Sequence, residues 1–64
     1  MGTLPKKSQI VAGSTVSIVT KEDQKNGHLT DGIVDEILTN SESHPHGIKV
    51  RLKGGKVGRV RIIQ

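Results

Sequence analysis

Residues 48–63, IKVRLKGGKVGRVRII, decide the fold of this 64-residue chain. From Ile48 to Leu52, apolar residues alternate with Lys or Arg, a period of two that is typical of a strand with one buried face. Gly54-Gly55 marks a turn, and a further strand is predicted from Val57 to Ile63. The stretch is therefore predicted to form a β-hairpin with one apolar face and one basic face.

The hydrophobic pattern also selects a register for this hairpin. A three-residue loop over residues 54–56, with a glycine in the left-handed conformation, pairs Val50 with Val60. In this register Ile48 faces Ile62 on the same side of the sheet. A two-residue turn would instead mix apolar side chains with charged ones on one face.

On the other face of the hairpin, this register places like charges opposite one another. Arg51 is predicted to face Arg59, and Lys49 to face Arg61; opposed like charges destabilise a sheet by roughly a few tenths of a kcal/mol per pair. Residues 47–64 contain six Lys or Arg and no Asp or Glu. Relief must therefore come from carboxylates of the preceding strand or from an anionic partner.

The rest of the chain also favours β-structure. Val and Ile make up 14 of the 20 apolar residues, and both pack well on a pleated sheet. Further strands are predicted over residues 16–20 and 29–38, the second with a bulge or bend near Asp35 that turns the flanking apolar pairs inward. Four or five short strands predict an all-β fold, a small SH3-like barrel. We expect one barrel domain over residues 10–64 and a flexible tail over residues 1–9.

Composition limits the function. The chain has no Cys, no Phe, Tyr or Trp, and a formal net charge of +4. Disulfides and thiolate zinc sites are therefore excluded, and no apolar run approaches the roughly 18 to 20 residues of a membrane span. Recognition of proline-rich peptides or of methyl-lysine is also disfavoured, because it needs grooves or cages of aromatic side chains, which this chain lacks. We expect a cytoplasmic protein with no membrane contact, no cofactor and no small-molecule substrate.

His44-Pro45-His46 is an unusual local feature. Pro45 favours an extended conformation at the preceding residue, so both imidazoles are expected on one side of the loop. A metal site would need further ligands, for which the sequence offers no recognised spacing. Ser43 adjoins His44, which is not the geometry of an activated nucleophile, so no catalytic residue is assigned. A purely structural loop and a loop whose imidazoles contact an anion remain as interpretations.

Lys21-Glu22-Asp23-Gln24 forms a second polar cluster, after the first predicted strand. In a small barrel, the loops after the first and second strands often lie side by side. Lys21 and Gln24 are therefore expected to flank His44 and His46 in one composite surface. The alternative is a solvated loop.

The stretch Ser43–Leu52, SHPHGIKVRL, is accompanied by further recognisable stretches at Gly13–Ile18, Lys21–Gln24, Leu29–Thr30, Gly32–Val34, Ile37–Ser41 and Gly58–Val60. Together they resemble the YwbE-like family of small uncharacterised bacterial and archaeal proteins, over residues 10–62. The resemblance implies a shared module and assigns no activity. In architecture, the predicted barrel is also similar to the KOW and Sm-like nucleic-acid modules.

The basic face predicts a non-enzymatic module that binds nucleic acid, RNA more than DNA, through its phosphates. The predicted contact residues are Lys49, Arg51, Lys53, Arg59 and Arg61 on the hairpin, with Lys21, Gln24, His44 and His46 on the rim. A protein-interaction module that docks an acidic partner is the alternative. A solvated basic face, and a metal-dependent or acid–base enzyme centred on the two histidines, are further readings.

Overall fold

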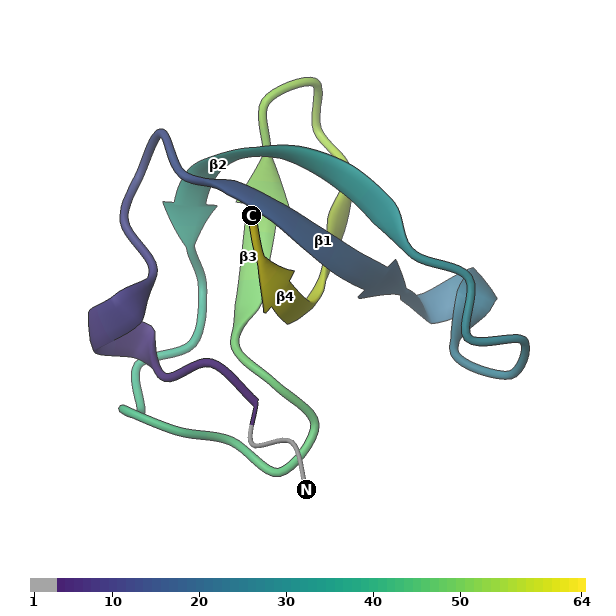
Figure 1. The fold of residues 1–64 in the computed structure, drawn as a ribbon, viewed down its shortest axis with the longest axis horizontal. Helices are drawn as coiled ribbons and strands as arrows, with labels where there is room; N and C mark the ends of the chain where they lie inside the picture. The colour runs from purple at the N-terminus through teal and green to yellow at the C-terminus, as the bar shows by residue number, and fades with distance from the viewer. Residues whose placement is uncertain (1–3) are drawn as a thin grey trace.

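The fold is a closed barrel of four antiparallel strands (Figure 1). The computed structural model describes residues 4–64. Each strand pairs with its neighbour in sequence, and the last also pairs with the first, which closes the barrel. The elements are η1 (Lys7–Gln9), β1 (Thr15–Thr20), η2 (Lys21–Asp23), β2 (Thr30–Ile37), β3 (Lys49–Leu52) and β4 (Val57–Ile63), where η denotes a short 3-10 helix. The predicted all-β, SH3-like barrel is confirmed.

Aliphatic side chains fill the inside of the barrel. They come from all four strands because alternate residues of a strand point to the same face. The buried members of this core are Ile10, Val16, Ile18, Val34, Ile48, Val50, Leu52 and Val60. Between residues 4 and 64, no helix has both the length and the apolar character needed to cross a membrane.

Part of the segment predicted as a flexible tail is attached to the loop between β2 and β3. The Lys7 N–H donates to the Glu42 carbonyl oxygen at 2.7 Å, and the Ser8 hydroxyl donates to the Glu42 carboxylate. Ile10 follows and is 2% exposed. The first three residues of the predicted tail lie outside the described residues.

The β3–β4 hairpin differs from the predicted register by two residues. Lys49 lies opposite Arg59, and Arg51 lies opposite Val57. The two predicted like-charge pairs are therefore wrong, and a single different pair, Lys49 with Arg59, takes their place. The loop has three residues, as predicted, but it spans 53–55 and is closed by the hydrogen bond from the Leu52 N–H to the Lys56 carbonyl oxygen.

Backbone geometry explains this difference. Gly54 and Gly55 have φ values of 103° and 100°, in a region of backbone conformation that residues other than glycine rarely adopt. The last two positions of the loop have a positive φ and are occupied by the two glycines, so Lys53 rather than Lys56 enters the loop. A shift of two residues leaves every side chain on its predicted face, so the hydrophobic pattern does not distinguish the two registers.

A bulge in β2 confirms the predicted bend near Asp35. The pairing of β2 with β3 changes register at this residue. Val34 is fully buried and Ile37 packs against the core, whereas Ile33 and Leu38 are 43% and 39% exposed. One member of each apolar pair thus turns inward, where both were expected to do so. The bend allows a short strand to follow the curvature of a small barrel.

A second bulge, in β4, was not predicted. The pairing of β4 with β1 changes register at Arg61. Val60 is buried before the bulge and Ile63 packs against the core after it. Arg61 and Ile62 are both exposed, so the expected inward contact of Ile62 with Ile48 is wrong.

Gly58 permits the close approach of β4 to β1. A methyl carbon added there would lie 2.5 Å from the Val19 carbonyl oxygen and 2.9 Å from Cδ1 of Ile18. We expect Gly58→Ala to destabilise the protein by about 1–3 kcal/mol, because the obstructing atoms include rigid backbone. Urea unfolding measures the change.

Gly32→Ala is the matched comparison for this prediction. Its added carbon would meet the end of the Leu52 side chain, at 2.5 Å, and a side-chain end shifts more easily than backbone does. We therefore expect a smaller loss than for Gly58→Ala. Equal stability of the Gly58 variant and the parent protein would contradict the close contact between β1 and β4 at Gly58.

The hairpin register is testable with engineered disulfides, since the chain has no Cys. Arg51 and Val57 are opposed in a non-hydrogen-bonded pair, whose Cα atoms lie about 4.5 Å apart in antiparallel sheets, within disulfide range. The Arg51→Cys/Val57→Cys variant should form an intramolecular disulfide readily. The Arg51→Cys/Arg59→Cys variant, matched to the other register, should not, because diagonal partners are about 7–8 Å apart. Mass spectrometry after mild oxidation distinguishes the two, and the reverse outcome would support the other register.

Candidate nucleic-acid interface

A groove of about 610 Å³ lies where η2 and the end of β1 meet the β3–β4 hairpin. Val19 of β1 and Gly58 of β4 line its apolar part. Four of its other lining residues carry positive charge and one carries negative charge. The charged and amide residues of the groove are Lys21, Glu22, Gln24, Lys49, Lys56 and Arg59.

The hairpin register places two of these cations side by side. Lys49 on β3 and Arg59 on β4 are directly opposed on the outer face of the sheet. Like charges in this position repel, and the sheet is less stable for it. An anion bound between them would relieve this repulsion.

Arg59 is oriented by the loop that precedes β3. Its Nη1 donates a hydrogen bond to the Gly47 carbonyl oxygen at 3.2 Å, and the residue is half-buried. A guanidinium has five N–H donors in a fixed plane, so donors remain for a ligand in the groove.

The η2 segment brings Lys21 and Gln24 to the opposite side of the groove. Asp23 holds this segment together, because its carboxylate accepts hydrogen bonds from Thr20 Oγ1 and from Asn26 Nδ2, both at 3.3 Å. Gly27 has a positive φ, and the chain reverses there toward β2. An Asn-Gly pair such as Asn26-Gly27 is typical of such a reversal. Of the two acidic residues in η2, Asp23 therefore makes its hydrogen bonds within the loop, whereas Glu22 lines the groove.

Arg51, a predicted phosphate contact, lies outside the groove. Its Nη2 is 3.1 Å from Asp35 Oδ2 and 2.8 Å from Glu36 Oε1, both on β2. The hydrogen bond to Asp35, followed by the charge of Glu36, raises the pKa of Arg51 above its ordinary value. The bulge in β2 brings Glu36 opposite Arg51, so carboxylates of the barrel itself offset this charge.

His44 and His46 belong to a turn rather than to the predicted extended segment. The Gly47 N–H donates to the His44 carbonyl oxygen at 3.0 Å, and the His46 N–H donates to Nδ1 of His44 at 3.1 Å. Pro45 and Gly47 suit this turn, since proline fixes φ near −65° and Gly47 has a φ of 100°. The two imidazole rings are 5.7 Å apart, so they do lie close together, as expected.

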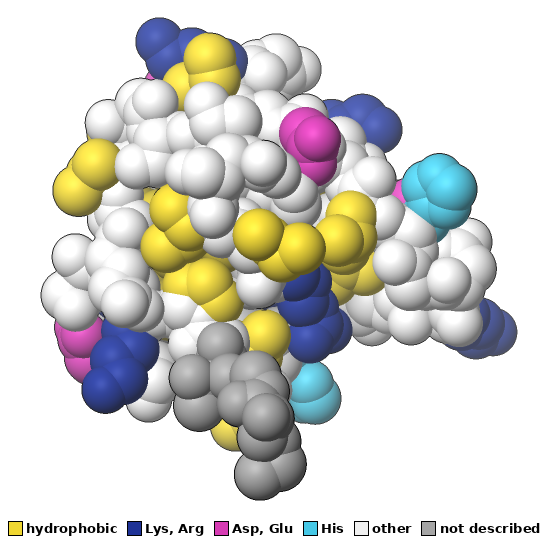
Figure 2. All heavy atoms as spheres, in the orientation of Figure 1, with side chains coloured by type: hydrophobic (Ala, Val, Ile, Leu, Met, Phe, Trp, Pro, Cys, Tyr) yellow, Lys and Arg dark blue, Asp and Glu magenta, His cyan; other side chains and the backbone are white. Residues whose placement is uncertain are grey.

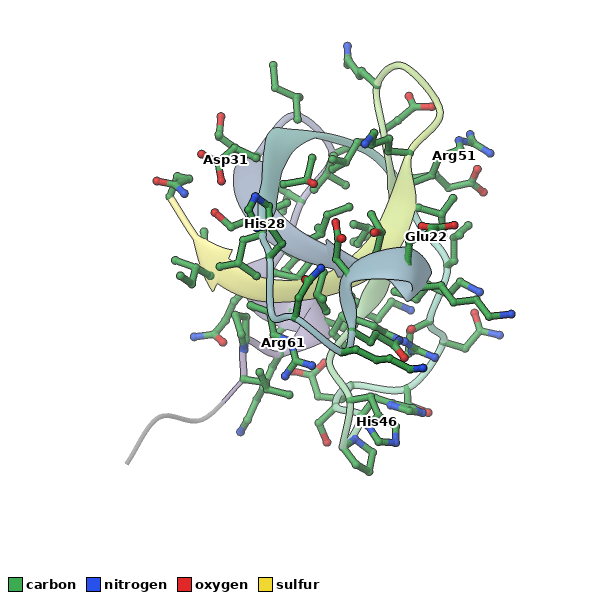
Figure 3. All side chains as sticks on the ribbon, turned by 90° about the vertical axis from the view of Figure 1, so that its right-hand side faces the viewer. Glu22, His28, Asp31, His46, Arg51 and Arg61 are labelled. Atoms are coloured by element: carbon green, nitrogen blue, oxygen red, sulfur yellow. The ribbon has the colours of Figure 1, made fainter. Side chains whose placement is uncertain are left out.

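Neither histidine lines the groove, and Glu22 of η2 and His46 lie well apart in Figure 3. The predicted composite surface of both loops is therefore wrong. No cluster of three or more His, Cys, Asp or Glu side chains suited to a metal ion occurs from residue 4 to residue 64.

Lys53 and Arg61 complete the predicted set, and neither lines the groove. Lys53 is in the hairpin loop, and Arg61 is at the bulge of β4, on a different side of the barrel from Arg51 (Figure 3). The groove thus unites Lys21, Gln24, Lys49 and Arg59 from the prediction. The sequence analysis missed Lys56 because it placed this residue in the hairpin loop. The preceding pair Gly54-Gly55 was the signal that could have placed the loop one residue earlier, with Lys56 outside it.

Comparison with known proteins places the chain in a family. Residues 3–63 match the family model described as "Uncharacterized conserved protein (DUF2196)". The chain is 57% identical over 53 residues to "Uncharacterized protein YwbE" of Bacillus subtilis (strain 168), a match that covers 83% of this chain and 82% of that protein. No solved structure matches it. The chain therefore belongs to the DUF2196 family, to which the YwbE-like resemblance of its sequence pointed.

Proposed function

We propose that this protein is a non-enzymatic, cytoplasmic module that binds single-stranded RNA, with the phosphates of the strand in the groove. One observation carries the proposal: four cationic side chains and a single carboxylate line the same hollow. Both ion pairs found within residues 4–64 are made by Arg51, so none of the four groove cations has a described carboxylate partner.

The distribution of charge supports an anionic ligand more strongly than the net charge does. Two carboxylates of β2 offset Arg51, although that side chain is 42% exposed. On the groove side, Lys49 and Arg59 remain opposed without such compensation. A concave surface with charges of one sign concentrates the potential and attracts ions of the other sign.

The shape of the site favours a single strand over B-form DNA. Direct reading of duplex DNA needs a protruding helix or two-stranded ribbon that enters the major groove. Here the cations line a concavity instead, which receives a strand. Gln24 adds an amide that both donates and accepts hydrogen bonds, as a ribose 2′-hydroxyl does, and this favours RNA.

Fluorescence anisotropy with a labelled single-stranded RNA tests the proposal. If the four groove cations each contact a phosphate, the slope of log affinity against log salt should be about −3, from roughly −0.7 per contact for single strands. The Lys21→Gln/Lys49→Gln variant should bind on the order of tenfold more weakly at low salt, with a slope shallower by about 1.4.

Lys6→Gln/Lys53→Gln is the matched control, because it removes the same charge outside the groove. Equal losses in the two double variants would show that net charge, and not the groove, governs binding. A poly-glutamate peptide of equal charge tests the alternative of an acidic protein partner. If it displaces RNA as effectively as unlabelled RNA does, the site is a docking surface for acidic proteins.

Lys49→Gln alone should stabilise the free protein at low salt, because it removes one member of the Lys49–Arg59 pair. A gain of a few tenths of a kcal/mol corresponds to a rise in Tm of about 1–3 °C for a domain of this size. The rise should disappear at about 1 M salt, where charges are screened within roughly 3 Å. Lys53→Gln serves as the control and should leave Tm unchanged; a fall in Tm for Lys49→Gln would contradict the repulsion.

A further inference from the structure

The bulge in β4 presents two consecutive side chains on the outer surface of the barrel. Arg61 and Ile62 are both exposed, whereas residues of a regular strand alternate between faces. Ile62 is 49% exposed, in a chain with only 20 apolar residues available for its core. Bulges recur where a strand must redirect a side chain for function.

Arg61 lies next to the proposed phosphate groove along the same strand. Arg59 lines the groove, and Arg61 is two residues further on; both lie on the outer surface of the barrel, on either side of the buried Val60. Two residues of a strand span roughly 7 Å. A nucleotide with its phosphate at Arg59 therefore has its neighbouring base within reach of Arg61.

The guanidinium of Arg61 is available for such a contact. Neither ion pair found from residue 4 to residue 64 involves it, in contrast to Arg51. Figure 2 shows hydrophobic side chains gathered across the face on which β1 and β2 lie in front, with a Lys or Arg side chain among them. Apolar and cationic groups thus lie side by side on that face, as Arg61 and the 49% exposed Ile62 do along β4.

The chemistry of these two side chains suits a nucleobase. A guanidinium is flat and stacks on bases, as aromatic rings do, and the chain has no Phe, Tyr or Trp to serve instead. An exposed isoleucine beside it extends the apolar contact area. We infer that Arg61 and Ile62 form a platform on which one base of the bound RNA stacks, an inference that rests on the proposed function of the groove.

Arg61→Lys tests the platform, because lysine keeps the charge and lacks the plane. The ligands are a single-stranded RNA oligonucleotide and an abasic oligonucleotide of the same backbone, length and charge. The parent protein should bind the base-bearing ligand about tenfold more tightly, the scale of one stacked base. Arg61→Lys should lose most of this preference and keep its salt slope. Arg51→Lys, the same exchange at the Asp35–Glu36 ion pair, should keep the preference.

The outcomes separate the two proposals. If the parent binds both ligands equally with the same salt slope, or if Arg61→Lys retains the full preference, the platform is wrong and the groove stands. If the parent binds neither ligand in a salt-dependent manner, the proposed function is wrong, and the platform with it. Circular dichroism of Arg61→Lys confirms that the variant is folded in each case.

Discussion

The pairing of β1 with both β2 and β4 is the constraint on which the rest of this structure depends. A chain with 20 apolar residues has little core, and closing the sheet buries β1 on both of its faces. Closure also leaves none of the strands between residues 4 and 64 with an unpaired edge. It requires the backbones of β1 and β4 to approach closely, which the missing side chain of Gly58 permits.

The bulges that bend the sheet around this core also arrange the surface charges. The bulge in β2 brings Glu36 opposite Arg51, where it joins Asp35 in offsetting the guanidinium. Arg59 has no such acidic neighbour in the described residues, because β4 pairs on its other side with β1, whose residues are uncharged, and Lys49 lies beyond the Glu36–Arg51 pair at the start of β3. The barrel is therefore electrostatically uneven, neutralised near β2 and basic near η2 and the hairpin.

Because the charge is unevenly distributed, a modest net charge can still produce a strongly positive region on the surface. A charge of +4 spread evenly over the surface would attract anions weakly, whereas four cations around one groove produce a local field. The lack of aromatic side chains limits how such a surface can discriminate among bases. Under the proposed function, phosphate contacts would set the affinity of such a site, and any preference for bases would have to come from hydrogen bonds or from flat guanidinium groups.

The sequence by itself determined the four strands, the bend at Asp35 and the face on which most apolar residues lie, because a period of two fixes which way a side chain points. Ile33, Leu38 and Ile62 were expected to face inward and are exposed. The sequence also indicated the glycine turn and four of the groove residues. The hairpin register needed the tertiary structure, since a shift of two residues preserves every face and yet exchanges the partners of Lys49 and Arg51. The bulge at Arg61 and the groove were likewise decided only by the tertiary structure, because both arise where β4 pairs with β1, a strand about 40 residues away.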